Sequence, residues 1–297
     1  MEVTLARDPA EPTPLELRSG RWYKREDLLA YSNGVNGKVR TTLHLARYAA
    51  ERGHPGLVYG GSVLAPALGR VASGAAYAGL ECALVIGSAP ETARRHPTVE
   101  VAYQAGAALH RAKVAYNPAL QKRAREIAAE TGYFQVPYGV STPSEWTREQ
   151  VRAFLECDGP QVQALARAGV ETLVIPFGSA NAAAGILYGL ATYGSGSIRR
   201  VCLIGVGPDK REWLWSQLEY AGVTHQQPYG IEYLPLYPHF AAYKDRMPER
   251  QDGIDFHPTY EGKVVRFLDT LRPDWWVRRN GETCLWIVGG PLQPGRA

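Results

Sequence analysis

The feature of this sequence that most constrains its fold is an alternation of short apolar segments with helix-like segments. Residues 56–60 (GLVYG) and 81–86 (ECALVI) are strand-like and apolar in their centres, and the small-residue-rich stretch 64–78 between them has a helical pattern. Short apolar strands separated by helices are typical of a parallel sheet that is covered by helices. The sequence therefore predicts an α/β fold.

The alternation runs in two series, which predicts two open, twisted, mainly parallel sheets with helices on both faces. In the first series the further predicted elements are helices at 41–52, 97–104 and 118–130 and strands at 107–110 and 133–136. In the second series they are strands at 171–175, 200–205 and 284–288, an extended piece at 231–236, and helices at 161–168, 210–221 and 260–270.

The composition excludes several classes of protein. The chain has 297 residues and a formal net charge of +4, which permits an anionic ligand or a nucleic acid but requires neither. No apolar stretch approaches the ~20 residues that span a bilayer, and the Pro-rich, acidic N-terminus is unlike a signal peptide. The four cysteines have no metal-binding spacing. We therefore expect no membrane contact, no metal and a reducing, cytoplasmic location.

Lys38 stands directly after the segment 33–37 (NGVNG) and before the predicted helix 41–52. Glycine and asparagine tolerate unusual backbone angles and let a backbone approach a ligand closely. A lysine in this position is well placed to meet a phosphorylated or carbonyl-bearing ligand. Taken alone, the pattern is more typical of a surface lysine in a polar turn.

A second candidate site lies where the strand 171–175 runs into a helix through small residues. The residues of this loop are Gly178, Ser179, Ala180, Asn181 and Ala182. Unpaired N–H groups at a helix start, together with the helix dipole, attract a phosphate, and small side chains allow it to approach. The loop has neither the Walker nor the GxGxxG pattern. A tight turn that serves only packing is the alternative.

Taken together, the motifs resemble those of the fold-type II pyridoxal-phosphate (PLP) enzymes, the tryptophan synthase β-like superfamily. The resemblance is closest to the 1-aminocyclopropane-1-carboxylate (ACC) deaminase and D-cysteine desulfhydrase group. It rests on four motifs in the same order: KREDL at 24–28 followed by K-x-R at 38–40, the small-residue loop at 178–185, Y-E-G-K at 260–263, and a strand ending in a Gly pair at 289–290.

The resemblance implies a role for each candidate residue. Lys38 would hold PLP as a Schiff base and move protons at the substrate α-carbon, and the loop 178–182 would bind the cofactor phosphate. Glu261 would keep the pyridine nitrogen protonated. Tyr260 would be a proton donor or acceptor, or would only pack on the ring.

The same resemblance implies a domain organisation. A large cofactor-binding domain would comprise residues 1–45 and 150–297, and a small mobile domain residues 46–149, with the cofactor between the domains. Relatives of this kind are commonly homodimers, so a homodimer is expected.

The chain departs from the family pattern where relatives bind the substrate carboxylate. A Ser-Asn pair begins the first helix of their small domain, whereas this chain has Ala65 and Pro66 there. Ser62 is the nearest hydroxyl, and Ala182 replaces a threonine of the phosphate loop. The expected substrate-binding residues are Ser62, Leu64, Ala65 and Tyr138.

A carboxylate needs hydrogen-bond donors when it is bound. Apolar surroundings would favour its loss as carbon dioxide, so we expect a PLP-dependent lyase that decarboxylates an amino acid. By analogy with phage pathways that trim amino acids on modified thymine in DNA, the substrate would be an amino-acid-modified nucleobase; the location would then be the host cytoplasm. Deaminase- or desulfhydrase-type elimination on a small amino acid is one alternative. A non-catalytic cofactor- or anion-binding protein is another.

Overall fold

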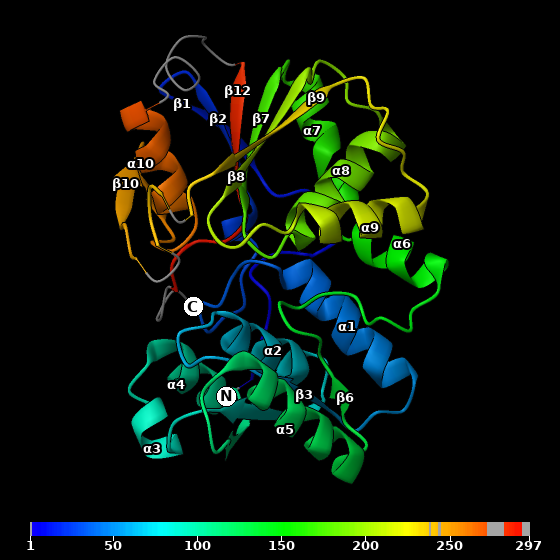
Figure 1. Ribbon diagram of the computed structural model, residues 1–297, viewed down its shortest axis with the longest axis vertical. Helices are drawn as coiled ribbons and strands as arrows, with labels where there is room; N and C mark the ends of the chain where they lie inside the picture. The colour runs from blue at the N-terminus through cyan, green and yellow to red at the C-terminus, as the bar shows by residue number, and fades with distance from the viewer. Residues whose placement is uncertain (1, 238, 243–244, 272–281, 293–297) are drawn as a thin grey trace. The chain divides into compact units, whose positions relative to one another are not determined.

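A computed structural model of the chain describes residues 2–237, 239–242, 245–271 and 282–292. The chain divides into two compact units (Figure 1). Unit 1 comprises Met1–Pro9, Ala30–Glu145 and Leu292–Ala297, and unit 2 comprises Ala10–Leu29 and Trp146–Pro291.

The boundaries of the units differ from the domain boundaries expected from the sequence. Residues 30–45, which we expected in the large domain, lie in unit 1. The physical reason is the packing of α1 (Val39–Glu51) against α2 (Ala67–Tyr77) and against the first strand of the unit 1 sheet. Lys38, directly before α1, is therefore a residue of unit 1.

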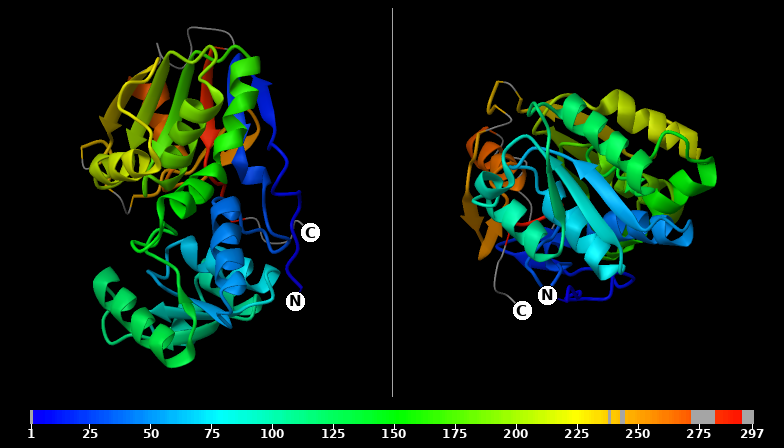
Figure 2. Two further views of the ribbon diagram at one scale, coloured as in Figure 1. Left: turned by 90° about the vertical axis from the view of Figure 1, so that its right-hand side faces the viewer. Right: turned by 90° about the horizontal axis from the view of Figure 1, so that it is seen from below.

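Unit 1 contains one four-stranded parallel sheet. Its strands are β3 (Gly56–Gly60), β4 (Glu81–Ile86), β5 (Ala108–Arg111) and β6 (Phe134–Gln135), in the order β5-β4-β3-β6. Figure 2 shows α5 (Asn117–Thr131) on one side of these strands and α1 and α2 on the other. The short helices α3 (Pro90–Ala93) and α4 (Pro97–Gln104) connect β4 to β5.

Unit 2 contains a six-stranded sheet in which every neighbouring pair except β1 and β2 is parallel. In spatial order the strands are β1 (Leu15–Arg18), β2 (Arg21–Arg25), β12 (Thr283–Ile287), β7 (Thr172–Phe177), β8 (Arg200–Gly205) and β9 (Gly230–Pro235). An N-terminal strand therefore pairs with a C-terminal one. The prediction of two open, mainly parallel sheets with helices is confirmed.

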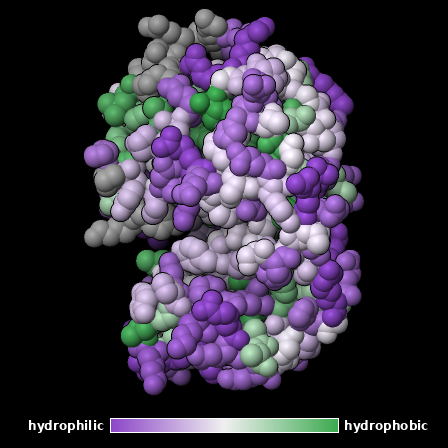
Figure 3. All heavy atoms as spheres, turned by 45° about the vertical axis from the view of Figure 1, so that its right-hand side comes forward, coloured by the Kyte–Doolittle hydropathy of each residue, from purple (hydrophilic) through white to green (hydrophobic). Residues whose placement is uncertain are grey.

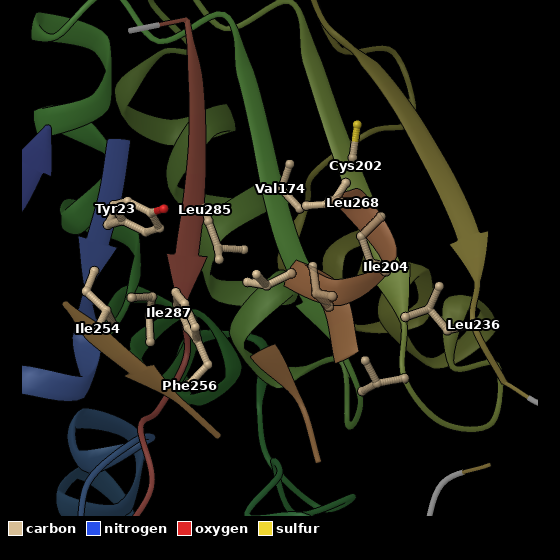
Figure 4. Packing of buried hydrophobic residues seen from close by; sticks show 13 residues of the cluster. Tyr23, Val174, Cys202, Ile204, Leu236, Ile254, Phe256, Leu268, Leu285 and Ile287 are labelled. Carbon is tan, nitrogen blue, oxygen red and sulfur yellow. The ribbon is translucent and has the colours of Figure 1, made fainter. Parts of the chain in front are cut away.

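Helices flank this second sheet. They are η1 (Glu26–Leu28), α6 (Arg148–Glu156), η2 (Gly159–Val162), α7 (Gln163–Arg167), α8 (Asn181–Tyr193), α9 (Arg211–Ala221) and α10 (Glu261–Leu271). Figure 4 shows α10 packed on one sheet face, where Leu268 lies near Val174 and Ile204 of neighbouring strands and belongs to the same buried cluster as Leu285. Burying each such side chain stabilises the folded state by about 2 kcal/mol.

Most predicted elements are present, with ends shifted by a few residues, but β2, η1, α3, α6 and the hairpin of β10 (Glu249–Gln251) and β11 (Ile254–Phe256) were not predicted. A signal for α6 existed in the sequence. Thr147 and Gln150 form a capping box, in which each side chain accepts a hydrogen bond from the other residue's backbone N–H.

The surface of the chain carries its hydrophobic side chains in small separate groups among hydrophilic ones on the face that Figure 3 shows. Among the described residues, no helix is long and apolar enough to cross a membrane. The described residues also contain no cluster of three or more side chains that could bind a metal ion.

Candidate functional site

Lys38 lies at the N-terminus of α1 in a left-handed backbone conformation, with φ of 53° and ψ of 25°. Gly37 before it also has a positive φ, of 72°. The left-handed region costs a non-glycine residue roughly 1–2 kcal/mol, and such strain is concentrated at functional sites. The first turn of α1 stabilises this arrangement, because the hydroxyls of Thr41 and Thr42 both donate to the carbonyl of Lys38.

The amine of Lys38 is held by a loop that is distant in sequence. Its Nζ donates a hydrogen bond of 2.6 Å to the carbonyl oxygen of Gly139. Gly139 and the buried Val140 both have positive φ, of 77° and 56°. A β-branched residue with a positive φ is a genuine outlier. The loop that orients the amine is therefore itself strained, as loops of functional sites often are.

The loop that precedes α2 uses its own donors internally. The Leu64 N–H donates to the Ser62 hydroxyl oxygen, and the Ala65 N–H donates to the Ser62 carbonyl. Pro66, the residue before α2, has no N–H. Leu64 is 65% exposed. Two backbone donors are thereby engaged and a third is missing from the loop where relatives of the predicted family bind a carboxylate.

In unit 2, the loop between β7 and α8 has the expected geometry for an anion site. Ala180, the residue before α8, has a φ of 68°, and the helix start carries no side-chain cap. The first N–H groups of an α-helix have no partner within the helix, and the dipole places positive potential there. Gly178, Ser179, Ala180, Asn181 and Ala182 thus present small or polar side chains around a helix N-terminus.

Tyr260 packs against this loop. A Cβ added to Gly178 would lie 3.4 Å from the Tyr260 ring, which is an ordinary van der Waals distance, so the ring lies directly beside this loop. The centroid of the Tyr260 ring also lies 4.8 Å from the centroid of the His257 ring. The Thr259 N–H donates to Nδ1 of His257, which leaves Nε2 as the protonated nitrogen of the neutral ring. His257 was not named in the sequence analysis.

Glu261 begins α10 and is 1% exposed. Its Oε1 accepts hydrogen bonds from the backbone N–H groups of Val288, at 2.9 Å, and Gly289, at 3.2 Å. Its Oε2 is buried without a hydrogen-bond partner among the described residues. Burial is the main cause that raises the pKa of Glu261 from 4.5 to about 8, and these backbone hydrogen bonds oppose the rise.

The structure distributes the sequence-predicted residues between the units. Lys38, Ser62, Leu64, Ala65 and Tyr138 belong to unit 1, and the loop 178–182, Tyr260 and Glu261 belong to unit 2. Within unit 1, Lys38 is joined to the residue that follows Tyr138, and within unit 2, Tyr260 is joined to the loop 178–182. Sequence reasoning did not name Gly139, although a glycine in a loop-like segment is a common turn residue.

The fold is shared with solved structures of one enzyme class. An ACC deaminase homologue is 19% identical, with a TM-score of 0.72, and the match covers 97% of this chain and 92% of that one. Threonine deaminase isoform 2 from Solanum lycopersicum is 13% identical, with a TM-score of 0.64, and the match covers 95% and 80%. The chain therefore has the fold of the fold-type II PLP-dependent enzymes, which confirms the fold that the sequence motifs predict.

A comparison of sequences gives a more specific match. The O-seryl-dTMP PLP-dependent decarboxylase of Salmonella phage ViI is 25% identical over 342 aligned positions, which cover 93% of this chain and 80% of that protein. No protein-family model matches the chain.

Proposed function

We propose that this chain is a PLP-dependent lyase that decarboxylates an amino acid attached to a thymidine nucleotide. The fold supports PLP chemistry at an amino-acid α-carbon, and the similarity to the phage ViI decarboxylase supports both the reaction and the nucleotide part of the substrate. The observation that carries the choice of decarboxylation is the apolar, internally bonded loop before α2.

The residues present fit PLP. The buried Glu261 has one oxygen held by two backbone N–H groups and a second oxygen that has no hydrogen-bond partner in the described part of the chain, as the partner of a pyridine N–H requires. The loop 178–182 at the start of α8 fits a phosphate, since small side chains leave its N–H groups accessible. Lys38 supplies the amine that binds an aldehyde. By their chemistry, these residues suit the ring nitrogen, the phosphate and the aldehyde of PLP, respectively.

The reaction breaks the bond between the α-carbon and the carboxyl carbon, releases carbon dioxide and puts a proton on the α-carbon. PLP, when bound, supplies an electron-withdrawing ring that takes up the electron pair of the broken bond. Glu261 stabilises a protonated ring nitrogen, because a cation beside it favours the ionised carboxylate. Lys38, whose amine the Gly139 carbonyl orients, delivers the proton to the α-carbon. Tyr260, packed on the phosphate loop, restricts the orientation of the cofactor ring.

The loop before α2 explains why the carboxylate is lost rather than retained. The Leu64 and Ala65 N–H groups are engaged by Ser62, and Pro66 has none. A substrate carboxylate against this loop therefore finds few donors, and a poorly solvated carboxylate is destabilised relative to neutral carbon dioxide. In a deaminase or desulfhydrase, the carboxylate must instead remain bound through the whole reaction.

The test is product analysis with O-seryl-dTMP. Decarboxylation yields carbon dioxide and an aminoethyl ether of the nucleotide, whereas elimination yields ammonia, a keto acid and the nucleotide without its amino acid. Carbon dioxide with the amine supports the proposal, and ammonia with the keto acid contradicts it in favour of a deaminase-type lyase. A protein that stays colourless with PLP, and whose spectrum Lys38→Ala does not change, would be neither of these enzymes.

Three further expectations go with this function. They are a homodimeric assembly, mobility of residues 46–149 during turnover, and the host cytoplasm as the location if the chain is phage-encoded. Each stays a prediction that follows from the resemblance and from the phage relative.

A further inference from the structure

Three loops of unit 1 gather at one edge of its sheet. They follow the strands β3, β5 and β6. Because these strands are parallel, the loops leave the sheet at the same edge, which is the one formed by the carboxyl ends of the strands. The chain that follows β5 then passes close to the carboxyl ends of β4 and β3. A Cβ added to Gly87, after β4, would lie 2.2 Å from the Ala115 Cβ, and one added to Gly60, the last residue of β3, 2.5 Å from the Leu120 carbonyl oxygen.

Four large apolar side chains are exposed on these loops, and we call them the aromatic rim. Its members are Leu64 (65% exposed), Val114 (47%), Tyr116 (61%) and Tyr138 (52%). The other exposed large apolar side chains described in unit 1 are Tyr77 and Tyr103. Tyr77 is the last residue of α2 and Tyr103 is next to the last residue of α4, and both helices end at the opposite edge of the sheet. Single exposed apolar residues are ordinary, but four around one edge indicate a binding surface.

The aromatic rim adjoins the amine of Lys38. Tyr138 directly precedes Gly139, whose carbonyl accepts the hydrogen bond from Lys38 Nζ. The side-chain amide of Asn117 donates a hydrogen bond of 2.9 Å to the Tyr138 hydroxyl, and Tyr116 directly precedes Asn117. Tyr138 is therefore held in one orientation, and a connected path leads from the amine through Tyr138 to Tyr116.

The charge of this edge favours an anion. The segments 60–67, 107–118 and 136–144 contain no aspartate or glutamate, whereas Arg111 and Lys113 are both present and exposed; the loop after β4, which leaves the sheet at the same edge, adds one acidic residue, Glu91, and two basic ones, Arg94 and Arg95. Aromatic side chains next to an excess of basic ones are the combination that binds a nucleobase and its phosphate.

We propose that the aromatic rim binds the nucleotide part of the substrate: Tyr138 stacks on the nucleobase that carries the amino acid, Tyr116 extends this apolar surface, and Lys113 binds the phosphate. Tyr138 takes the base because it is the rim residue nearest in the chain to the carbonyl that orients the Lys38 amine. The identity of the ligand rests on the proposed function, but the binding surface is defined by the residues of unit 1 alone.

The first test measures turnover of O-seryl-dTMP by the PLP-loaded enzyme and its variants. Tyr138→Ala is expected to raise KM by about 10- to 100-fold, the usual effect of losing one base stack, with a smaller effect on kcat. Tyr138→Phe keeps the ring and is expected to retain most of the affinity. The matched control is Tyr103→Ala, which removes an exposed tyrosine of the same unit at the opposite sheet edge. Equal KM values for Tyr138→Ala and Tyr103→Ala would overturn the inference.

The second test separates the phosphate from the base. Lys113→Glu is expected to weaken binding of O-seryl-dTMP by roughly 10-fold at low salt, and to leave the corresponding nucleoside, which has no phosphate, unaffected. An equal loss for nucleotide and nucleoside would exclude a phosphate contact by Lys113.

The third test distinguishes failure of this inference from failure of the proposed function. Binding of dTMP, which cannot be decarboxylated, is measured by titration calorimetry on the PLP-loaded protein and on Tyr138→Ala. If dTMP binds and Tyr138→Ala weakens it although O-seryl-dTMP is not turned over, the binding surface stands and the proposed reaction falls. If O-seryl-dTMP is turned over but dTMP does not bind, or Tyr138→Ala changes nothing, the reaction stands and this inference falls.

Discussion

Replacing Glu261 by glutamine tests the electrostatics of the candidate site without any substrate. The folded chain holds this carboxyl fully buried, with a pKa of about 8, whereas an exposed glutamate has a pKa of 4.5. Between these values the unfolded chain releases the proton and the folded chain keeps it. The stability that Glu261 contributes is therefore fully present below about pH 4.5 and is lost as the pH rises to about 8. The difference corresponds to about 5 kcal/mol at most.

Glutamine cannot ionise, so Glu261→Gln is expected to remove this part of the pH dependence. Near pH 5 the variant and the wild type should agree within about 1 kcal/mol, because the amide oxygen can still accept from Val288 and Gly289 and the amide nitrogen replaces an oxygen that is already unsatisfied. Near pH 8 the variant should be the more stable by roughly 4 kcal/mol in the absence of cofactor.

The assay is urea unfolding of the cofactor-free protein between about pH 5 and about pH 8, followed by tryptophan fluorescence. All 7 tryptophans belong to the segments of unit 2, so the signal reports the unit that contains Glu261. The control is Glu212→Gln, which changes an exposed glutamate of α9 in the same unit and is expected to keep the wild-type slope. Parallel profiles for the wild type and Glu261→Gln would refute the assignment of a buried, largely neutral carboxyl.

Three further predictions address the other parts of the site and its support. Lys38→Ala is expected to abolish the yellow absorbance of the PLP-loaded protein, whereas Lys122→Ala, an exposed lysine of α5, should retain it; a retained band in Lys38→Ala would contradict the role of this lysine. Ala182→Asp in the first turn of α8 should stabilise the cofactor-free protein by about 0.3–1 kcal/mol in unfolding measurements, because the helix dipole favours a negative charge there. In a cofactor titration the same variant should bind PLP at least 10-fold more weakly, because the new carboxylate repels the phosphate; unchanged PLP affinity would place the phosphate elsewhere. Lys24→Met should lower the free energy of unfolding of unit 2 by about 3–5 kcal/mol in urea, because the buried Lys24 amine donates to the Thr13 carbonyl and to Gln161 Oε1 and pairs with the buried Glu26 at 3.3 Å. A decrease of less than about 1 kcal/mol would show that the ion pair is solvated.

The candidate site could be predicted from the sequence to the extent that its signals are local. Lys38 behind a Gly- and Asn-rich segment, and the loop 178–182 between a strand and a helix, are each defined within a few residues, because backbone freedom and helix starts depend on near neighbours. The role of Glu261 could be named only through the family resemblance, and its hydrogen bonds to the strand end at 288–289 were not predicted, since 27 residues separate the Glu261 carboxylate from its donor on Val288.

The sequence by itself determined the class of fold, since strands that are apolar throughout and alternate with helices can be buried only in a parallel, helix-covered sheet. It also determined which residue types stand at the helix starts of the site. Only the tertiary structure decided that the Gly139 carbonyl, 101 residues away, orients the Lys38 amine, and that Lys38 belongs with unit 1. Only the tertiary structure likewise left one Glu261 oxygen buried with no hydrogen-bond partner among the residues that the structure describes. The physical reason is that burial and long-range hydrogen bonds depend on where distant segments meet, which local spacing does not specify.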